Sequence, residues 1–125
     1  MNETLLIIGG IYNLSFAVFH LLFWKIFDWK IDLPRLKLVN RAIVQVLNLC
    51  LTFVFIAFGI LSLLYSAEMA QTDLGRALIS VAALFWLLRA VEQIVFFGLK
   101  SWISSAFLMV FIGGFCLYSV ALFIP

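Results

Sequence analysis

Four long apolar stretches account for most of the chain. They cover about residues 4–27, 42–66, 76–99 and 102–124. A helix needs about 20 apolar residues to cross the hydrocarbon core of a bilayer. Only helices and closed barrels satisfy their own backbone in lipid, and these runs are too long for barrel strands and lack a two-residue alternation. The sequence therefore predicts an all-α membrane protein with a single domain of four transmembrane helices.

The composition excludes a water-soluble fold. Of the 125 residues, 66% are hydrophobic and 11% are charged, against about 45–50% apolar and about 25% charged in soluble domains. The net charge of +2 does not indicate a nucleic-acid partner. The first stretch contains Glu3 and lacks a basic leader and a cleavage site, so we expect a retained span rather than a signal peptide. We expect an integral membrane protein, placed in a bacterial inner membrane, with membrane lipids as its neighbours.

The basic residues predict the orientation. The connector 28–40, together with Lys25 before it and Arg41 after it, carries five basic and two acidic residues, and the very short third connector carries Lys100. Lys and Arg in short loops favour the cytoplasmic side. We therefore expect an antiparallel bundle with both termini outside. In the first connector, Lys30, Arg35 and Lys37 lie among apolar residues and are candidates for contact with anionic lipids.

Local signals mark several helix ends. Asn40 is expected to cap the second helix, and Thr72 or Asp73 the third. Pro34 argues against one continuous helix through the first connector.

Polar and small residues recur at helical spacing in every span, which predicts faces turned toward the bundle interior. In the first span these residues are Gly9, Asn13, Ala17, His20 and Trp24, and in the second they are Arg41, Gln45, Asn48, Thr52, Phe55, Gly59, Ser62 and Ser66. In the third span they are Ala82, Trp86, Arg89, Glu92, Gln93 and Phe96. In the fourth span they are Ser101, Ser104, Ser105, Gly113, Gly114 and Ser119.

Three polar residues interrupt the third apolar stretch: Arg89, Glu92 and Gln93. A charge at the centre of a span costs about 2.5–3.5 kcal/mol even on the lenient insertion scale. The spacings i+3 and i+4 put all three residues on one helix face, where Arg89 and Glu92 are expected to be coupled. Such residues indicate either a functional site or a structural ion pair.

Three further polar residues are expected at the same depth: His20, Gln45 and Asn48. Counted from the cytoplasmic ends at 1.5 Å per residue, these groups and the triad lie roughly 6–15 Å into the membrane. The amides both donate and accept hydrogen bonds, and His20 changes charge near neutral pH. We predict that these six residues form one polar cluster that binds a substrate or an ion.

Three functions fit this cluster. The first is binding or translocation of a small polar solute, an ion or a proton, for which so small a bundle would need to form a homo-oligomer, most simply a dimer. The second is a structural or accessory membrane subunit in which the cluster is only a buried salt-bridge network. The third is a lipid- or quinone-modifying enzyme with Glu92 and His20 as an acid–base pair. No nucleophile motif is present and no catalytic residue is assigned, so a non-enzymatic role is favoured.

The sequence predicts no cofactor or metal. Haem held between two histidines would require a dimer, because His20 is the single histidine. His20, Glu92, Cys50 and Cys116 do not have the spacing of zinc ligands. Both cysteines lie in apolar runs, where cysteine behaves as a small hydrophobic residue, and no disulfide is expected.

The size and four-span plan resemble those of the small multidrug transporters and the small fluoride channels. The resemblance is one of plan only. Multidrug transporters carry their essential carboxylate in the first span, whereas the buried carboxylate of this chain, Glu92, is in the third. No residue role is carried over from either family.

Overall fold

The structure, a computed structural model, describes residues 1–124, and every element among them is helical. Four helical segments are long and apolar enough to cross a membrane, which confirms the prediction of four apolar helices. The elements are α1 (Asn2–Leu21), α2 (Phe23–Ile26), α3 (Trp29–Asp32), the 3-10 helix η1 (Leu33–Arg35), α4 (Leu38–Leu64), α5 (Ser66–Gln71), α6 (Asp73–Glu92), the π-helix η2 (Gln93–Phe97) and α7 (Trp102–Phe123).

The helix ends differ from the predicted ones in two places. The first long helix ends at Leu21 rather than near residue 27, because Leu22 leaves the helical region (φ −88°, ψ 1°) and α2 follows as a separate turn. The predicted cap at Asn40 is wrong, since α4 already begins at Leu38 with Lys37 in the cap position. The cap at Thr72 is confirmed: its hydroxyl accepts a hydrogen bond of 3.0 Å from the backbone N–H of Gly75.

The connector before α4 is not one continuous helix, as expected from Pro34. It forms the short helix α3 and the 3-10 turn η1, which contains the proline. Asp28, at the start of α3, adopts a left-handed conformation with φ 51°. The connector is thus a series of short turns at one end of α4.

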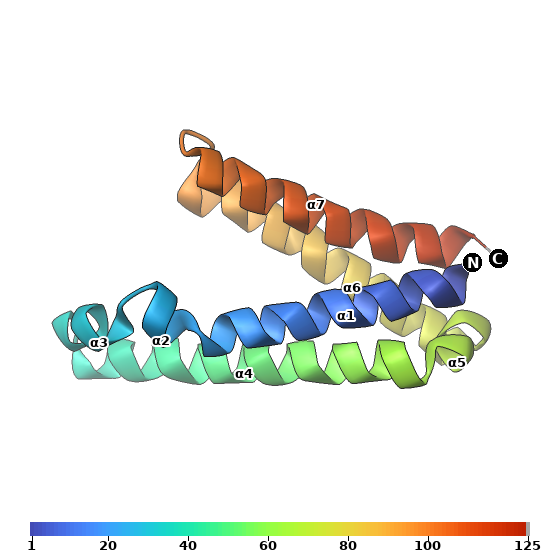
Figure 1. Ribbon diagram of the computed structural model, residues 1–125, viewed down its shortest axis with the longest axis horizontal. Coiled ribbons are helices and arrows are strands. Elements are labelled where there is room, and N and C mark those ends of the chain that lie inside the picture. Colours follow the sequence, from blue (N-terminus) through green and yellow to red (C-terminus); the bar gives the residue numbers. More distant parts are fainter. Residues whose placement is uncertain (125) are drawn as a thin grey trace.

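The long helices form two hairpins that diverge (Figure 1). α1 packs along α4, and α6 packs along α7. The hairpins meet where α1 contacts α7, whereas α4 and α6 make almost no close backbone approach within the described chain. The two pairs are close near the N-terminus and separate toward the end that carries α2, α3 and the α6–α7 turn. The fold is therefore a wedge with one narrow and one wide end.

Glycines allow the close contact between α1 and α4. A Cβ atom on Gly10 would lie 2.8 Å from the carbonyl oxygen of Gly59, and one on Gly59 would lie 2.6 Å from Cγ of Leu14. Small residues of this kind let membrane helices approach each other closely. The two glycines therefore set the separation within the first hairpin.

The contact between α1 and α7 pairs tyrosines with glycines. A Cβ atom on Gly9 would lie 2.7 Å from the ring of Tyr118, and one on Gly114 would lie 2.6 Å from the hydroxyl of Tyr12. The Tyr118 hydroxyl accepts a hydrogen bond of 2.7 Å from Asn13 and lies 3.0 Å from the hydroxyl oxygen of Ser62 on α4. This buried network joins three helices at the narrow end. Its tyrosines were not among the residues that the sequence predicted to face inward.

Most of the predicted inward faces are buried. The face of α4 is the clearest, because Asn48, Thr52, Phe55, Gly59 and Ser62 are all buried. Four residues predicted to face inward do not. The side chains of Trp24 and Phe96 are 48% and 79% exposed, and Ser101 and Gly113 on α7 are exposed as well. Phe96 lies in η2, whose π-helical turn holds an extra residue and so rotates the positions that follow Gln93 away from the α6 face.

Candidate functional site

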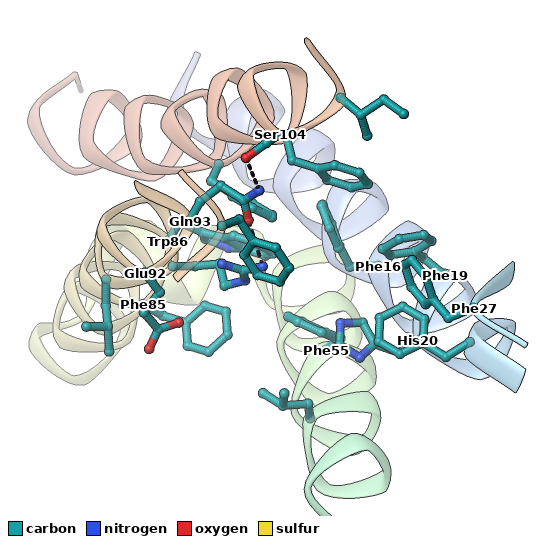
Figure 2. A pocket seen from close by; sticks show the side chains of 18 of the residues that line it. Phe16, Phe19, His20, Phe27, Phe55, Phe85, Trp86, Glu92, Gln93 and Ser104 are labelled. Carbon is teal, nitrogen blue, oxygen red and sulfur yellow. Dashed lines mark hydrogen bonds between the residues drawn. The ribbon is translucent and has the colours of Figure 1, made fainter. Parts of the chain in front are cut away.

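A cavity of about 690 Å³ occupies the wide part of the wedge, between the two hairpins. This volume lies within the usual range of small-molecule sites, about 300–1,000 Å³. Figure 2 shows α1 and α4 on one side of it and α6 and α7 on the other, with His20 and Phe55 facing Trp86, Glu92 and Gln93 across the space. Its lining is mainly aromatic, with a few polar groups on the α6 side.

Four packed rings line the end of the cavity nearest the middle of the bundle. Trp86 is central: its ring centroid lies 4.9 Å from that of Phe16, 5.6 Å from that of Phe55 and 5.9 Å from that of Phe111. The four residues come from four different helices, and all are buried. They form a rigid floor, because rings packed in these arrangements hold each other in place.

Arg89 lies directly above this floor. Its guanidinium carbon is 4.4 Å from the centroid of Phe111 and 5.8 Å from that of Phe97, so the cation is held over two ring faces. Its Nη2 donates a hydrogen bond of 3.0 Å to Oε1 of Gln93. A guanidinium has several further N–H donors, and Arg89 lines the cavity.

Gln93 connects Arg89 to α7. Its Nε2 donates a hydrogen bond of 2.9 Å to the hydroxyl of Ser104 (Figure 2). The Ser104 hydroxyl in turn donates to the backbone carbonyl of Gly98. Gln93 is the first residue of the π-helix η2, and Gly98 ends this helix with a φ of 71°. Single π-helical turns are frequent at functional sites. Here the turn orients the amide that holds Arg89.

The expected ion pair between Arg89 and Glu92 is not formed. Among residues 1–124 the single ion pair within 4.0 Å joins Arg35 to Asp32, at 3.8 Å and on the surface. The reason is orientation: the Arg89 guanidinium turns toward Gln93 and Phe111, whereas Glu92 lies beside Phe85 on the other edge of α6 (Figure 2). Both charged residues line the same cavity without a direct contact within 4.0 Å.

The remaining predicted site residues lie on the first hairpin, and one of them lines the cavity. His20 faces the cavity, and its Nδ1 lies 2.8 Å from Oδ1 of Asn48, whose Nδ2 donates to the His20 carbonyl oxygen. Asn48, which does not itself line the cavity, thus holds the imidazole of His20 in place. Gln45 is not among the lining residues, and its amide donates at 3.2 Å to the carbonyl of Arg41 on its own helix. The structure brings Arg89, Glu92, Gln93 and His20 together, with Asn48 as a support.

Sequence reasoning missed the aromatic walls of the cavity. Phe16, Phe19, Phe23 and Phe27 all line it. Their spacing of 3, 4 and 4 residues is the helical spacing used above for polar residues, so the signal was present among the 14 phenylalanines of the chain. Phenylalanine on a membrane helix usually faces lipid, so this spacing alone does not predict a cavity wall.

The site offers charge and hydrogen bonds rather than metal ligands. No group of three or more His, Cys, Asp or Glu side chains within residues 1–124 is arranged to hold a metal ion. Cys50 and Cys116 are both free and exposed. The arrangement places one cation, one carboxylate, an amide and an imidazole at the border of an aromatic chamber.

Comparisons with protein-family models, with curated proteins and with solved structures find no match to this chain. The function must therefore be inferred from the chemistry of the cavity.

Proposed function

We propose that the protein binds a small amphipathic molecule in the cavity between its hairpins. The observation that carries this proposal is the position of Arg89, a half-buried cation that faces an aromatic chamber and has no carboxylate oxygen within 4.0 Å of its guanidinium nitrogens. A charge held away from water requires a partner. An anionic or hydrogen-bond-accepting group of the ligand would supply it.

The lining favours an amphipathic ligand over a bare ion. An ion or strongly hydrated solute would lose water against the phenylalanine walls formed by Phe19, Phe23 and Phe107 without recovering hydrogen bonds. A molecule with an apolar body buries that body against the rings, which contributes about 25 cal/mol per Å² of apolar surface removed from water. Gln93, His20 and Ser104 can orient the polar group of such a ligand.

We also propose an orientation of the protein in the membrane. The basic connector lies at the wide end of the wedge, so the positive-inside rule puts that end at the cytoplasm and both termini outside. Lys30, Arg35 and Lys37 are exposed there and are available to anionic lipid headgroups. We also propose that the protein lies in the bacterial inner membrane and that it forms a homo-oligomer.

A structural role is the second candidate, and one observation favours it. The chain of hydrogen bonds from Arg89 through Gln93 and Ser104 to Gly98 ties α6 to α7 without a ligand. In that case the protein would be an accessory subunit, and the polar cluster would fix the register of the helices.

Native mass spectrometry of the purified protein separates the two candidates. We expect wild-type protein released from mild detergent to carry a small molecule, and Arg89→Gln to lose it while retaining its helical content. Arg41→Gln is the matched control, because Arg41 does not line the cavity. A wild-type protein free of adducts in every membrane mimetic would contradict binding and favour the structural role.

A further inference from the structure

The two sides of the wedge are closed to different extents. On the α1–α7 side, the rings of Phe19 and Phe107 stack with centroids 5.6 Å apart and planes 29° apart. On the α4–α6 side, Phe55 and Phe85 meet at 5.7 Å beside the floor, and the two helices have almost no close backbone approach elsewhere in the described chain. Ring contacts thus cross both sides at similar distances, but close backbone approach is found between α1 and α7 and almost not between α4 and α6, so the α4–α6 side is the less closed of the two.

Two leucines mark this opening. Leu51 of α4 and Leu88 of α6 both line the cavity, and the side chain of Leu88 is also 58% exposed. A side chain that faces the cavity and the outside at once lies at its rim. Phe97 and Ile103, which are 69% and 51% exposed, form the rim at the wide end, and Leu88 marks the part of the rim between α4 and α6. Because α4 and α6 are membrane-spanning candidates, that rim faces hydrocarbon rather than water.

The charges at the cavity indicate a zwitterion. Arg89 and Glu92 line the same space with no guanidinium nitrogen within 4.0 Å of a carboxylate oxygen, so the two do not form a direct ion pair. A purely anionic ligand would satisfy Arg89 and add a like charge near Glu92. A ligand with a phosphate and an ammonium group would supply a partner for each residue and leave the occupied site without net charge.

From these observations we infer that the occupant is a zwitterionic phospholipid, which enters sideways between α4 and α6. This inference rests on the proposed ligand-binding function and names the class of ligand. The phosphate lies at Arg89, the ammonium lies at Glu92, and the acyl chains pass the rim at Leu88 into the bilayer.

The charges at the cavity lie deep in the membrane span. Arg89 lies eight residues before Phe97, the end of the helical segment, which corresponds to about 12 Å at 1.5 Å per residue. A headgroup at Arg89 would be well inside a hydrocarbon core of about 30 Å. Pairing with Arg89 and Glu92 would offset part of the cost of taking the headgroup out of water.

Fluorescence of Trp86 provides the test. Trp86 forms part of the cavity floor, and the other three tryptophans, Trp24, Trp29 and Trp102, are replaced by phenylalanine. The protein is placed in bilayers that contain equal fractions of brominated phosphatidylethanolamine or brominated phosphatidylglycerol, whose chain bromines quench tryptophan on contact. We expect stronger quenching of Trp86 by the ethanolamine lipid. Arg89→Gln should abolish this quenching, and Glu92→Gln should abolish the preference between the two headgroups.

The outcomes distinguish the inference from the proposed function. Equal or no quenching by the two lipids, together with a small-molecule adduct in native mass spectrometry, would overturn the phospholipid and leave ligand binding intact. No quenching and no adduct would overturn both. Stronger quenching by phosphatidylglycerol would overturn the zwitterionic headgroup.

A pair of neighbouring leucines tests the route. Leu88→Phe places a larger side chain at the rim, whereas Leu87→Phe makes the same exchange at a residue that does not line the cavity. We expect Leu88→Phe to reduce the quenching of Trp86 and Leu87→Phe to leave it unchanged. Equal quenching in both variants would overturn entry between α4 and α6.

Discussion

The Nη2 atom of Arg89 donates a hydrogen bond of 3.0 Å to Oε1 of Gln93, four residues further along the same helical segment. The amide nitrogen of Gln93 donates to Ser104 on the next helix, so a single side chain holds the half-buried cation and links it to α7. The position of Arg89 in the cavity therefore depends on Gln93 and on the π-helical turn that begins there.

Replacing Gln93 by leucine should remove both hydrogen bonds of its side chain. We expect the free energy of unfolding to fall by about 0.5–2 kcal/mol, the range of polar contacts between membrane helices. The measurement is reversible unfolding in detergent micelles. Gln45→Leu is the matched control, because the Gln45 amide bonds only to a carbonyl of its own helix. A loss as large in the control would contradict a special role for Gln93.

Replacing Glu92 by glutamine tests the absence of an ion pair with Arg89. Removing one partner of a buried salt bridge typically costs about 3–5 kcal/mol. Because no such pair exists within 4.0 Å, we expect Glu92→Gln to change the free energy of unfolding by much less than this. The same unfolding assay applies, and a loss of about 3–5 kcal/mol would show that the two residues are paired in the membrane.

Adding a methyl group at Gly10 should push the first hairpin apart. The new Cβ would lie 2.7 Å from Cγ of Leu63 and 2.8 Å from the carbonyl oxygen of Gly59. Overpacking of this kind costs about 1–3 kcal/mol.

Gly113→Ala is the control for Gly10→Ala, because its Cβ would meet no atom within 4 Å. Alanine is favoured over glycine in a helix by about 1 kcal/mol, so this variant should be unchanged or slightly more stable. Thermal unfolding of the two variants side by side checks the prediction. Equal stability of both would contradict the close contact between α1 and α4.

The helices and most of their inward faces could be predicted from the sequence, because hydropathy and helical spacing are local properties. The face of α4 from Asn48 to Ser62 is the clearest case. The break at Leu22 could not be predicted, since its neighbours Leu21 and Phe23 give no signal for a helix end. The predicted inward position of Phe96, after Gln93, was wrong because the prediction assumed α-helical spacing where the chain forms a π-helical turn.

The candidate site could be predicted in part. Arg89, Glu92, Gln93 and His20 line one cavity, but spacing along a helix does not say which way each side chain turns. Arg89 and Glu92 therefore share a face without pairing. The cavity itself depends on the divergence of the two hairpins, which is a long-range property set where Gly9 meets Tyr118 and Gly114 meets Tyr12.

The central claim is that Arg89 faces a ligand rather than a protein carboxylate. The most direct measurement is a high-resolution experimental structure of the protein in a lipid bilayer disc. We predict non-protein density in the cavity, with its polar end against the Arg89 guanidinium and its body between α4 and α6. A wedge closed around a direct Arg89–Glu92 ion pair, with no density beside Trp86, would contradict the account.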